Sequence, residues 1–155
     1  MISSNTNAVV HAPTAGASCS RWSLPLLRVA MGLFLLMWGV DKLVAVDGAQ
    51  QIFERFYLLS AGPTIVRIAG VAEILVALLL MAGMLRRPVA WVVLVANAVS
   101  AIASWRQIVD PWGVLGLTRG GTHLFLASII ILAVSVVLVI DADVPHRPSR
   151  GPVPL

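Results

Sequence analysis

Glu73 is the residue of this sequence with the clearest chemical potential, because it interrupts a long apolar run. If that run crosses a bilayer as a helix from about Thr64, a rise of 1.5 Å per residue places the carboxylate roughly 14 Å from the helix start, near the middle of a ~30 Å hydrocarbon core. An ionised carboxylate at that depth costs several kcal/mol unless it is paired, hydrogen-bonded or protonated. We therefore expect Glu73 to face the interior of a helix bundle or a hydrated cavity.

Two basic residues, Arg28 and Lys42, are candidate partners for that carboxylate. Both lie on one stripe of the preceding apolar run, and depth counting puts each roughly 10 Å from Glu73 along the membrane normal, a gap that long side chains can close. The alternative is that these two side chains extend to opposite membrane interfaces. Small residues on the same faces favour close helix contact, and the expected helix-packing positions are Gly32, Gly39 and Gly70.

Polar residues at helical spacing also mark the third and fourth apolar runs. Asn97 and Ser100 share a stripe of the third run, and Ser128 and Ser135 share one of the fourth. If these stripes face Glu73, the bundle encloses a small polar pocket lined by Glu73, Asn97 and Ser100, which the two basic side chains enter from opposite sides. The simpler interpretation is interhelical hydrogen bonding, worth about 0.6–2 kcal/mol per residue.

The connection after the third run, residues 105–113, is unusually rich in aromatic and charged residues for a loop. Trp105, Arg106 and Asp110 could cap the mouth of the bundle, where an aromatic face and a guanidinium would hold a flat, carbonyl-bearing ring such as a quinone head group. His123 opens the fourth run and could exchange a proton with such a ligand. The alternative is that Trp105 and His123 are interfacial anchors and that Arg106 and Asp110 form an ion pair at a helix end.

Composition places the chain in lipid. Of 155 residues, 59% are hydrophobic and 12% are charged, against about 45–50% and about 25% in an ordinary soluble domain, and the mean hydropathy is +0.93. A spanning helix needs about 20 apolar residues, which leaves room for about four spans. We predict an all-α integral membrane protein, a bundle of four transmembrane helices within residues 23–140, with a short amphipathic segment between the first and second spans. The predicted spans cover about residues 24–43, 64–85, 88–105 and 123–140, and residues 1–22 and 141–155 are predicted to be disordered tails.

The charged residues punctuate the apolar runs instead of gathering on one face, which indicates a topology signal and argues against nucleic-acid binding. Counting Lys and Arg near the span ends gives a weak bias for both termini in the cytoplasm. Cys19 is the single cysteine and there are three histidines, so we expect no disulfide, no metal site and no covalently bound cofactor. The chain also lacks a self-contained catalytic motif.

A further set of residues carries a family resemblance. They are Arg28, Gly32, Phe34, Gly39, Lys42 and Leu43, followed by Gly70, Glu73 and Gly83. Their types and order resemble the DoxX-like family of small bacterial membrane proteins, over about residues 24–140. The chain departs from many members in having Trp105 and Arg106 where a histidine is expected near the end of the third span.

The resemblance implies a four-helix protein of the bacterial inner membrane. Relatives occur as a subunit of thiosulfate:quinone oxidoreductase and in membrane assemblies that handle sulfur compounds or oxidative stress. We therefore expect a membrane subunit or docking partner of a quinone-linked oxidoreductase, whose ligand is a quinone or a small acidic solute and whose protein partner is an oxidoreductase subunit or a second copy of the chain. Two alternatives stay open: a small proton-coupled transporter or permease-like protein, and a structural assembly factor.

Overall fold

The computed structural model describes residues 17–143, with side chains from Trp22 onward. The elements, in chain order, are α1 (Ala17–Val44), α2 (Val46–Tyr57), α3 (Pro63–Ala82), α4 (Arg86–Ala103), α5 (Trp105–Val109), the 3-10 helix η1 (His123–Leu126) and α6 (Ala127–Asp143). Four segments are long and apolar enough to cross a membrane: Trp22–Val44, Pro63–Ala82, Arg86–Ala103 and His123–Asp143. The predicted all-α, four-span architecture is confirmed, and α2 is the helix between the first two spans.

The inner boundaries of both predicted tails are wrong. Residues 17–22 belong to α1, because an established helix extends by further residues at little cost. Residues 141–143 belong to α6, whose last turn is stabilised by an ion pair of Asp141 with Arg28 of α1. The remaining parts of the predicted tails, residues 1–16 and 144–155, lie outside the described residues.

The turn between α3 and α4 is set by local sequence. Gly83 adopts a φ of 67°, the left-handed conformation that ends a helix, and its N–H bonds to the carbonyl of Leu80. The following helix begins at Arg86, two residues before the predicted start at Pro88, because a proline in the first helical turn loses no intrahelical hydrogen bond.

The helices pack as two antiparallel pairs. α1 lies along α3, where the glycines allow close approach: a methyl group at Gly70 would lie 2.8 Å from the carbonyl oxygen of Gly39. α4 lies along α6, and Val93 of α4 and Leu138 of α6 are almost fully buried in a core that also includes Met31 of α1. Small residues bring the first pair together, and branched apolar residues fill the second.

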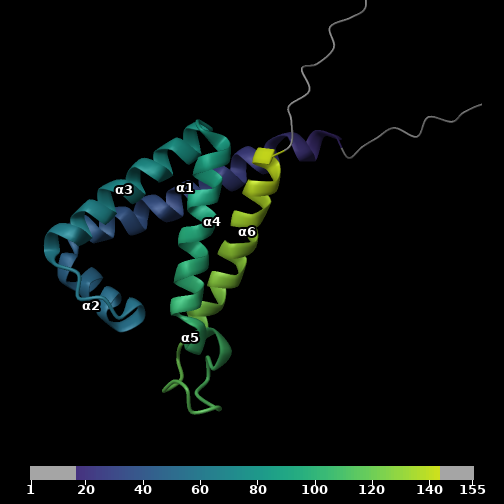
Figure 1. Cartoon of the computed structure of the whole chain (residues 1–155). Helices are drawn as coiled ribbons and strands as arrows, with labels where there is room; N and C mark the ends of the chain where they lie inside the picture. The colour runs from purple at the N-terminus through teal and green to yellow at the C-terminus, as the bar shows by residue number, and fades with distance from the viewer. Residues whose placement is uncertain (1–16, 144–155) are drawn as a thin grey trace, which may run out of the picture.

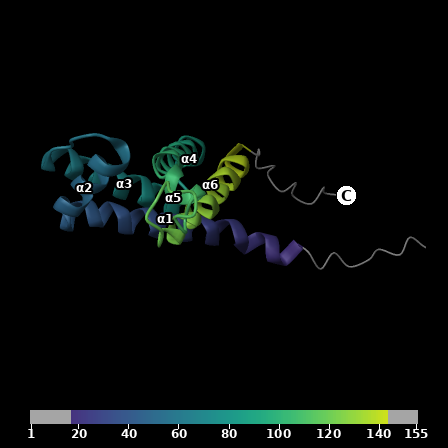
Figure 2. The same cartoon turned by 90° about the horizontal axis from the view of Figure 1, so that it is seen from below.

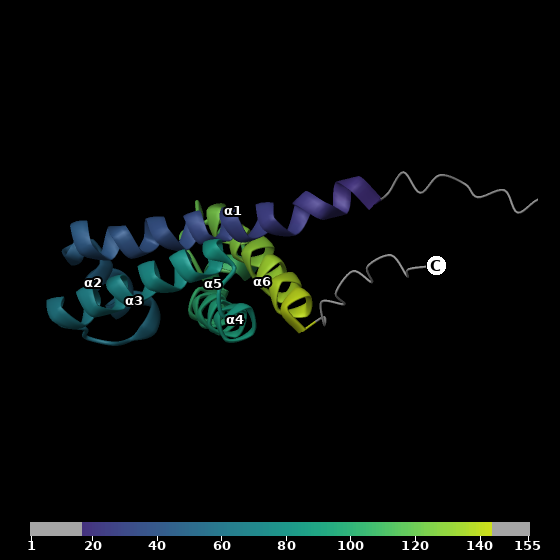
Figure 3. The ribbon, with the colours of Figure 1, turned by 90° about the horizontal axis from the view of Figure 1, so that it is seen from above.

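The two pairs meet at one end and diverge at the other (Figure 1). They meet beside the α3–α4 turn, at the end of the molecule that carries Arg28, Arg86 and Arg87, which we call the arginine end. The described ends of α1 and α6 lie on this side as well. At the opposite end α2 runs from the end of α1 toward α4. The views from below and from above show the same two pairs, with α1 passing alongside α6 (Figures 2 and 3).

Candidate functional site

A cavity of about 530 Å³ occupies the space between the diverging helix pairs. Its wall takes side chains from both pairs, from α2 and from η1. The residues that line the cavity include Phe34, Trp38, Lys42, Phe53, Phe56, Tyr57, Glu73, Asn97, Ser100, Leu124, Phe125, Ala127, Ser128 and Ile131. Most of this wall is apolar or aromatic, and the polar groups come mainly from α1, α3 and α4. The cavity therefore offers an apolar volume with a local polar region.

Three charged residues line this cavity, Asp41, Lys42 and Glu73, and the last two form an ion pair. The ammonium Nζ lies 2.5 Å from Oε2 of the carboxylate, and the side chains are 16% and 23% exposed. The pair forms because Gly39 and Gly70 bring α1 against α3 one helical turn away from these side chains. Glu73 thus faces the cavity and has the partner that its depth in the membrane requires.

Lys42 is held in place by the preceding turn of α1 as well. Its Nζ donates a hydrogen bond of 3.4 Å to the backbone carbonyl of Trp38 and lies 5.6 Å from the centre of the Trp38 ring. An ammonium has three N–H donors. Two are directed to Glu73 and Trp38, which leaves one for a group inside the cavity.

Hydrogen bonds between helices border the polar region. Asn97 donates to the hydroxyl of Ser135 at 2.8 Å, and that hydroxyl donates to the carbonyl of Ile131, so α4 is joined to α6 inside the membrane. Ser100 shares a hydrogen bond of 2.8 Å with the phenol of Tyr57, which joins α4 to α2. Asn97 and Ser100 therefore line the cavity and also fix the register of its walls.

The helix α2 closes the cavity at the end opposite the arginine end. Phe53, Phe56 and Tyr57 line the cavity, and the ring of Phe56 lies 5.6 Å from that of Phe125 in η1. The amide of Gln50 donates to the carbonyl of Ala61 at 2.8 Å, which fixes α2 against the chain segment that leads into α3. The apolar face of this amphipathic helix is thus a wall of the cavity.

Arg28 does not enter the cavity, contrary to prediction. It pairs with Asp141 of α6, and Nη2 of Arg86 lies 2.7 Å from the same carboxylate oxygen. These three residues form a cluster at the arginine end, whereas Lys42 lies near the other end of α1. The prediction was wrong because the extension of α6 to Asp143 supplies Arg28 with a nearer carboxylate than Glu73.

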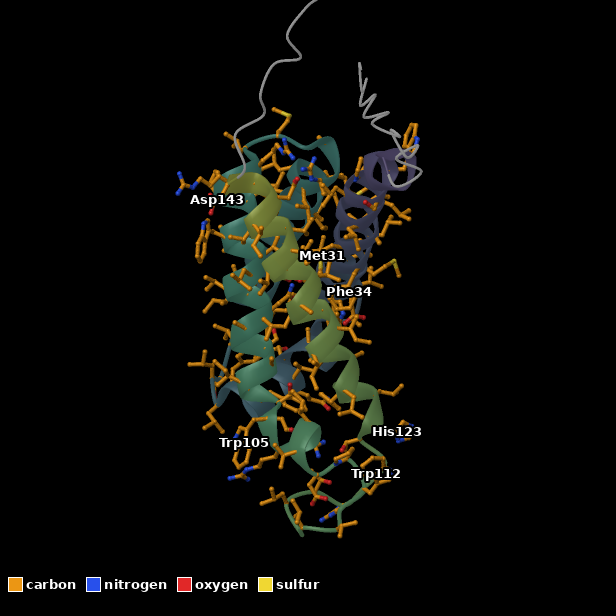
Figure 4. The ribbon with its side chains drawn as sticks, turned by 90° about the vertical axis from the view of Figure 1, so that its right-hand side faces the viewer. Met31, Phe34, Trp105, Trp112, His123 and Asp143 are labelled. Atoms are coloured by element: carbon orange, nitrogen blue, oxygen red, sulfur yellow. The ribbon has the colours of Figure 1, made fainter. Side chains whose placement is uncertain are left out.

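The predicted cap of Trp105, Arg106, Asp110 and His123 does not line the cavity either. The guanidinium of Arg106 lies over the Trp105 ring, 5.6 Å from its centre, and both residues and His123 are exposed. Figure 4 shows Trp105 and His123 at the far end of α4 and α6, well away from Phe34. Because α5 turns the chain outward after α4, these side chains point away from the bundle.

Asp110 organises the loop that follows α5. Its carboxylate accepts hydrogen bonds from the backbone N–H groups of Leu115, Leu117 and Thr118, at 3.2, 2.9 and 3.3 Å, and not from Arg106 as the alternative interpretation predicted. Burial by itself raises the pKa of Asp110, but these loop N–H groups lower it by more, so the pKa lies below its ordinary value. Asp110 is therefore a structural residue of the loop.

Several lining residues were missed by the sequence analysis. Trp38, Tyr57, Phe56 and Phe125 lie in segments where an apolar or aromatic residue is ordinary, so their types gave no signal. The alternation of polar and apolar residues around Phe56 did predict an amphipathic helix, but amphipathicity does not say which surface the apolar face covers.

Comparison with known proteins identifies the family of this chain. A family model described as DoxX matches residues 23–105, more than half of the chain. The match includes Lys42, Glu73, Asn97 and Ser100, whereas the loop organised by Asp110 and all of α6 lie beyond it. No curated protein and no solved structure matches the chain.

Proposed function

The chain belongs to the DoxX family and is a multi-pass membrane protein, and from this premise we propose that it is a membrane subunit of a quinone-linked oxidoreductase that holds the quinone in its cavity. The observation that carries the proposal is the cavity itself, which combines aromatic walls with the Lys42–Glu73 pair. A quinone has complementary features: a flat ring that can pack against aromatic side chains, and two carbonyl oxygens that can accept hydrogen bonds from a charged donor.

The volume of the cavity and its hydrogen-bond donors both support a quinone as the ligand. Ligand sites of about 300–1,000 Å³ enclose drug-sized molecules, and the cavity of about 530 Å³ falls in this range. The remaining N–H of Lys42 would donate to one carbonyl oxygen, and the hydroxyl of Ser100 or Tyr57 would donate to another polar atom. The rings of Phe53 and Phe56 would supply apolar faces for the quinone ring.

The quinone, when bound, would supply the two-electron, two-proton chemistry, and the residues of this chain would position it. Glu73 holds the ammonium of Lys42 at the cavity through their ion pair. The aromatic residues of α2 line the same cavity, and apolar surroundings strengthen the electrostatic interaction of the pair with a carbonyl dipole. The electron donor would be a partner enzyme subunit. By the positive-inside rule, we place the arginine end, with Arg28, Arg86 and Arg87, on the cytoplasmic side of a bacterial inner membrane.

Tryptophan fluorescence tests the binding step directly. Trp38 lines the cavity and is 41% exposed, whereas Trp91 of α4 is 47% exposed and does not line it, so the two form a matched pair. Two proteins would be prepared in lipid nanodiscs, each with one of these tryptophans kept and the other four replaced by phenylalanine. We expect ubiquinone or menaquinone to quench Trp38 saturably and to quench Trp91 only in proportion to quinone in the lipid. Equal, non-saturating quenching of both would contradict the proposal.

The role of the ion pair is tested in the same assay. Glu73→Gln should weaken quinone binding to the Trp38 protein about tenfold, equivalent to about 1.4 kcal/mol, because Lys42 loses the carboxylate that orients it. Glu54→Gln, an exposed position of α2 outside the cavity wall, is the matched control and should bind unchanged. Equal binding by Glu73→Gln and Glu54→Gln would show that the pair has no part in the site.

The subunit role needs a separate measurement. The tagged chain, extracted gently from its native membrane, should retain an oxidoreductase subunit and a solvent-extractable quinone in stoichiometric amounts. Recovery of the chain without either would favour the transporter alternative, which solute flux into liposomes would then test.

A further inference from the structure

The net positive charge of this protein belongs to one end of the bundle. The arginine end has three basic residues and two carboxylates, Asp141 and Asp143. The segments that continue the chain from this end, residues 1–21 and 144–155, add Arg21, Arg147 and Arg150 and no acidic residue. The rest of the chain has equal numbers of basic and acidic residues, which are Lys42, Arg55, Arg67, Arg106 and Arg119 against Asp41, Asp47, Glu54, Glu73 and Asp110. The formal net charge of +4 therefore comes from the arginine end and its flanking segments.

Two guanidinium groups share one carboxylate at this end. Nη2 of Arg28 and Nη2 of Arg86 both donate to Oδ2 of Asp141, and the three side chains are 17%, 28% and 11% exposed. The guanidinium of Arg28 also lies beside the α3–α4 turn, because a methyl group at Gly83 would be 3.7 Å from its Nη1. Among the described residues, one carboxylate thus faces two cations in a cluster that is largely shielded from water. An excess charge in such surroundings is costly unless an anion offsets it.

Arg28 has donors that such an anion could use. A guanidinium carries five N–H groups in a planar fork, which fits the oxygens of a phosphate as well as those of a carboxylate. Within the part of the chain that the structure describes, the side chain of Arg28 makes its polar contact with Asp141 through a single nitrogen, Nη2. The N–H groups on Nε and Nη1 remain for another oxygen anion.

The surroundings of the cluster indicate that this anion belongs to a lipid. Arg86 is the first residue of a membrane-spanning helix and Arg28 reaches the same carboxylate, so both guanidinium groups lie near the membrane boundary, as lipid phosphates do. The turn that leads into Arg86 exposes two apolar side chains, Met84 at 58% and Leu85 at 63%. An acyl chain would cover these side chains while the phosphate contacts the arginines, whereas a free phosphate ion would leave them bare.

We propose that the arginine end binds an anionic phospholipid, whose phosphate contacts Arg28 and Arg86 and whose acyl chains pack against Met84 and Leu85. The ligand class is a lipid with a net negative charge, because a zwitterionic lipid brings its own cation and does not offset the charge of the cluster. Arg87 is 72% exposed and adds to the attraction of the head group from the rim of the site. The site shares no residue with the wall of the cavity.

Lipid titration followed by native mass spectrometry tests this site. The protein in a mild polyoxyethylene detergent is mixed with phosphatidylglycerol, or with phosphatidylcholine of the same acyl chains, at constant ionic strength. The fraction of lipid-bound protein gives the two dissociation constants. Arg28→Gln removes one guanidinium of the site, and Arg67→Gln, which removes an exposed arginine near the other end of α3, is the matched control. Asp141→Asn keeps both guanidinium groups and removes the carboxylate that competes with the phosphate.

We expect the unaltered protein to bind phosphatidylglycerol about fivefold more tightly than phosphatidylcholine, and Arg28→Gln, but not Arg67→Gln, to lose about fivefold in this binding. Asp141→Asn should bind phosphatidylglycerol about fivefold more tightly, a gain that a disturbed structure would not give.

Three results would overturn the proposal. They are equal affinities for the two lipids, equal binding of phosphatidylglycerol by Arg28→Gln and Arg67→Gln, and weaker binding by Asp141→Asn. Displacement of phosphatidylglycerol by millimolar inorganic phosphate would overturn it as well, because the site would then take a free ion and not a lipid.

Discussion

Replacing Gly70 with alanine tests whether the close contact of α1 and α3 is what stabilises the first helix pair. A methyl group at this position would lie 2.8 Å from the carbonyl oxygen of Gly39 and 3.0 Å from Cβ of Lys42. A backbone oxygen cannot rotate out of the way, so the two helices would have to separate. Such overpacking costs about 1–3 kcal/mol, and the better helix propensity of alanine returns up to about 1 kcal/mol. We expect a net loss of about 1–2 kcal/mol in the free energy of unfolding.

Two other glycines give the matched controls. A methyl group at Gly48 of α2 would meet no atom within 4 Å, so Gly48→Ala should gain about 0.5–1 kcal/mol from helix propensity alone. A methyl group at Gly32 would overlap the side chain of Met81, which can adopt another rotamer, and would lie 3.2 Å from the backbone carbonyl oxygen of Ala77, farther than the 2.8 Å at Gly70. Gly32→Ala should therefore cost less than Gly70→Ala.

Reversible unfolding in mixed micelles of dodecyl maltoside and increasing dodecyl sulfate, followed by circular dichroism, measures these differences. The three substitutions are chemically identical, so the order of stability depends on what each methyl group meets. Gly70→Ala that is as stable as the unaltered protein would refute the argument from helix contact. A loss of stability in Gly48→Ala would refute the use of helix propensity to estimate the net effect.

Two further predictions concern the ends of the bundle. Asp141→Asn removes the carboxylate shared by Arg28 and Arg86, whose side chains are 17% and 28% exposed, and should lower the free energy of unfolding by about 2 kcal/mol in the same assay. Asp143→Asn breaks the more exposed pair with Arg87 and should lower it by less than about 1 kcal/mol. Equal losses for the two variants would contradict this ranking. The pKa of the Asp110 carboxyl group is lowered, because the hydrogen bonds from the loop N–H groups outweigh the effect of burial. The contribution of the ionised carboxylate to loop order is therefore complete above the ordinary Asp pKa of about 3.9, and it is lost as the pH falls through the lowered pKa. The amide NMR signals of the loop should accordingly move only below about pH 3.9, and a transition above that value would contradict the assignment.

The depth of Glu73 in the membrane made the surroundings of its carboxylate predictable from the sequence. A carboxylate near the middle of an apolar run must face a partner or a cavity, and the structure provides both in Lys42 and the surrounding wall. The helix spacing of Gly39 and Gly70 was equally informative, because a close approach of two backbones needs small residues on both faces.

The position of Arg28 could not be derived in the same way. Its partner, Asp141, lies 113 residues later in the chain, in a segment whose charges and prolines are typical of a tail. Spacing within a helix predicts which side chains share a face, but not which residue of a distant helix lies opposite. The same limit applies to Asp110, where helical spacing indicated a pair with Arg106, although the helix ends at Val109 and the carboxylate turns to the loop backbone.

The two ion pairs that α1 forms, through Lys42 and through Arg28, differ in chain separation, and this has a consequence for biosynthesis. Lys42 meets Glu73 after only 31 residues, so α1 and α3 can enter the bilayer with this pair already neutralised. Arg28 must wait 113 residues for Asp141, and until α6 has been made its guanidinium has to remain at the membrane surface. Insertion of the last helix therefore both pairs Arg28 and completes the wall of the cavity, so a chain released early from the ribosome would have an unpaired arginine and an incomplete cavity.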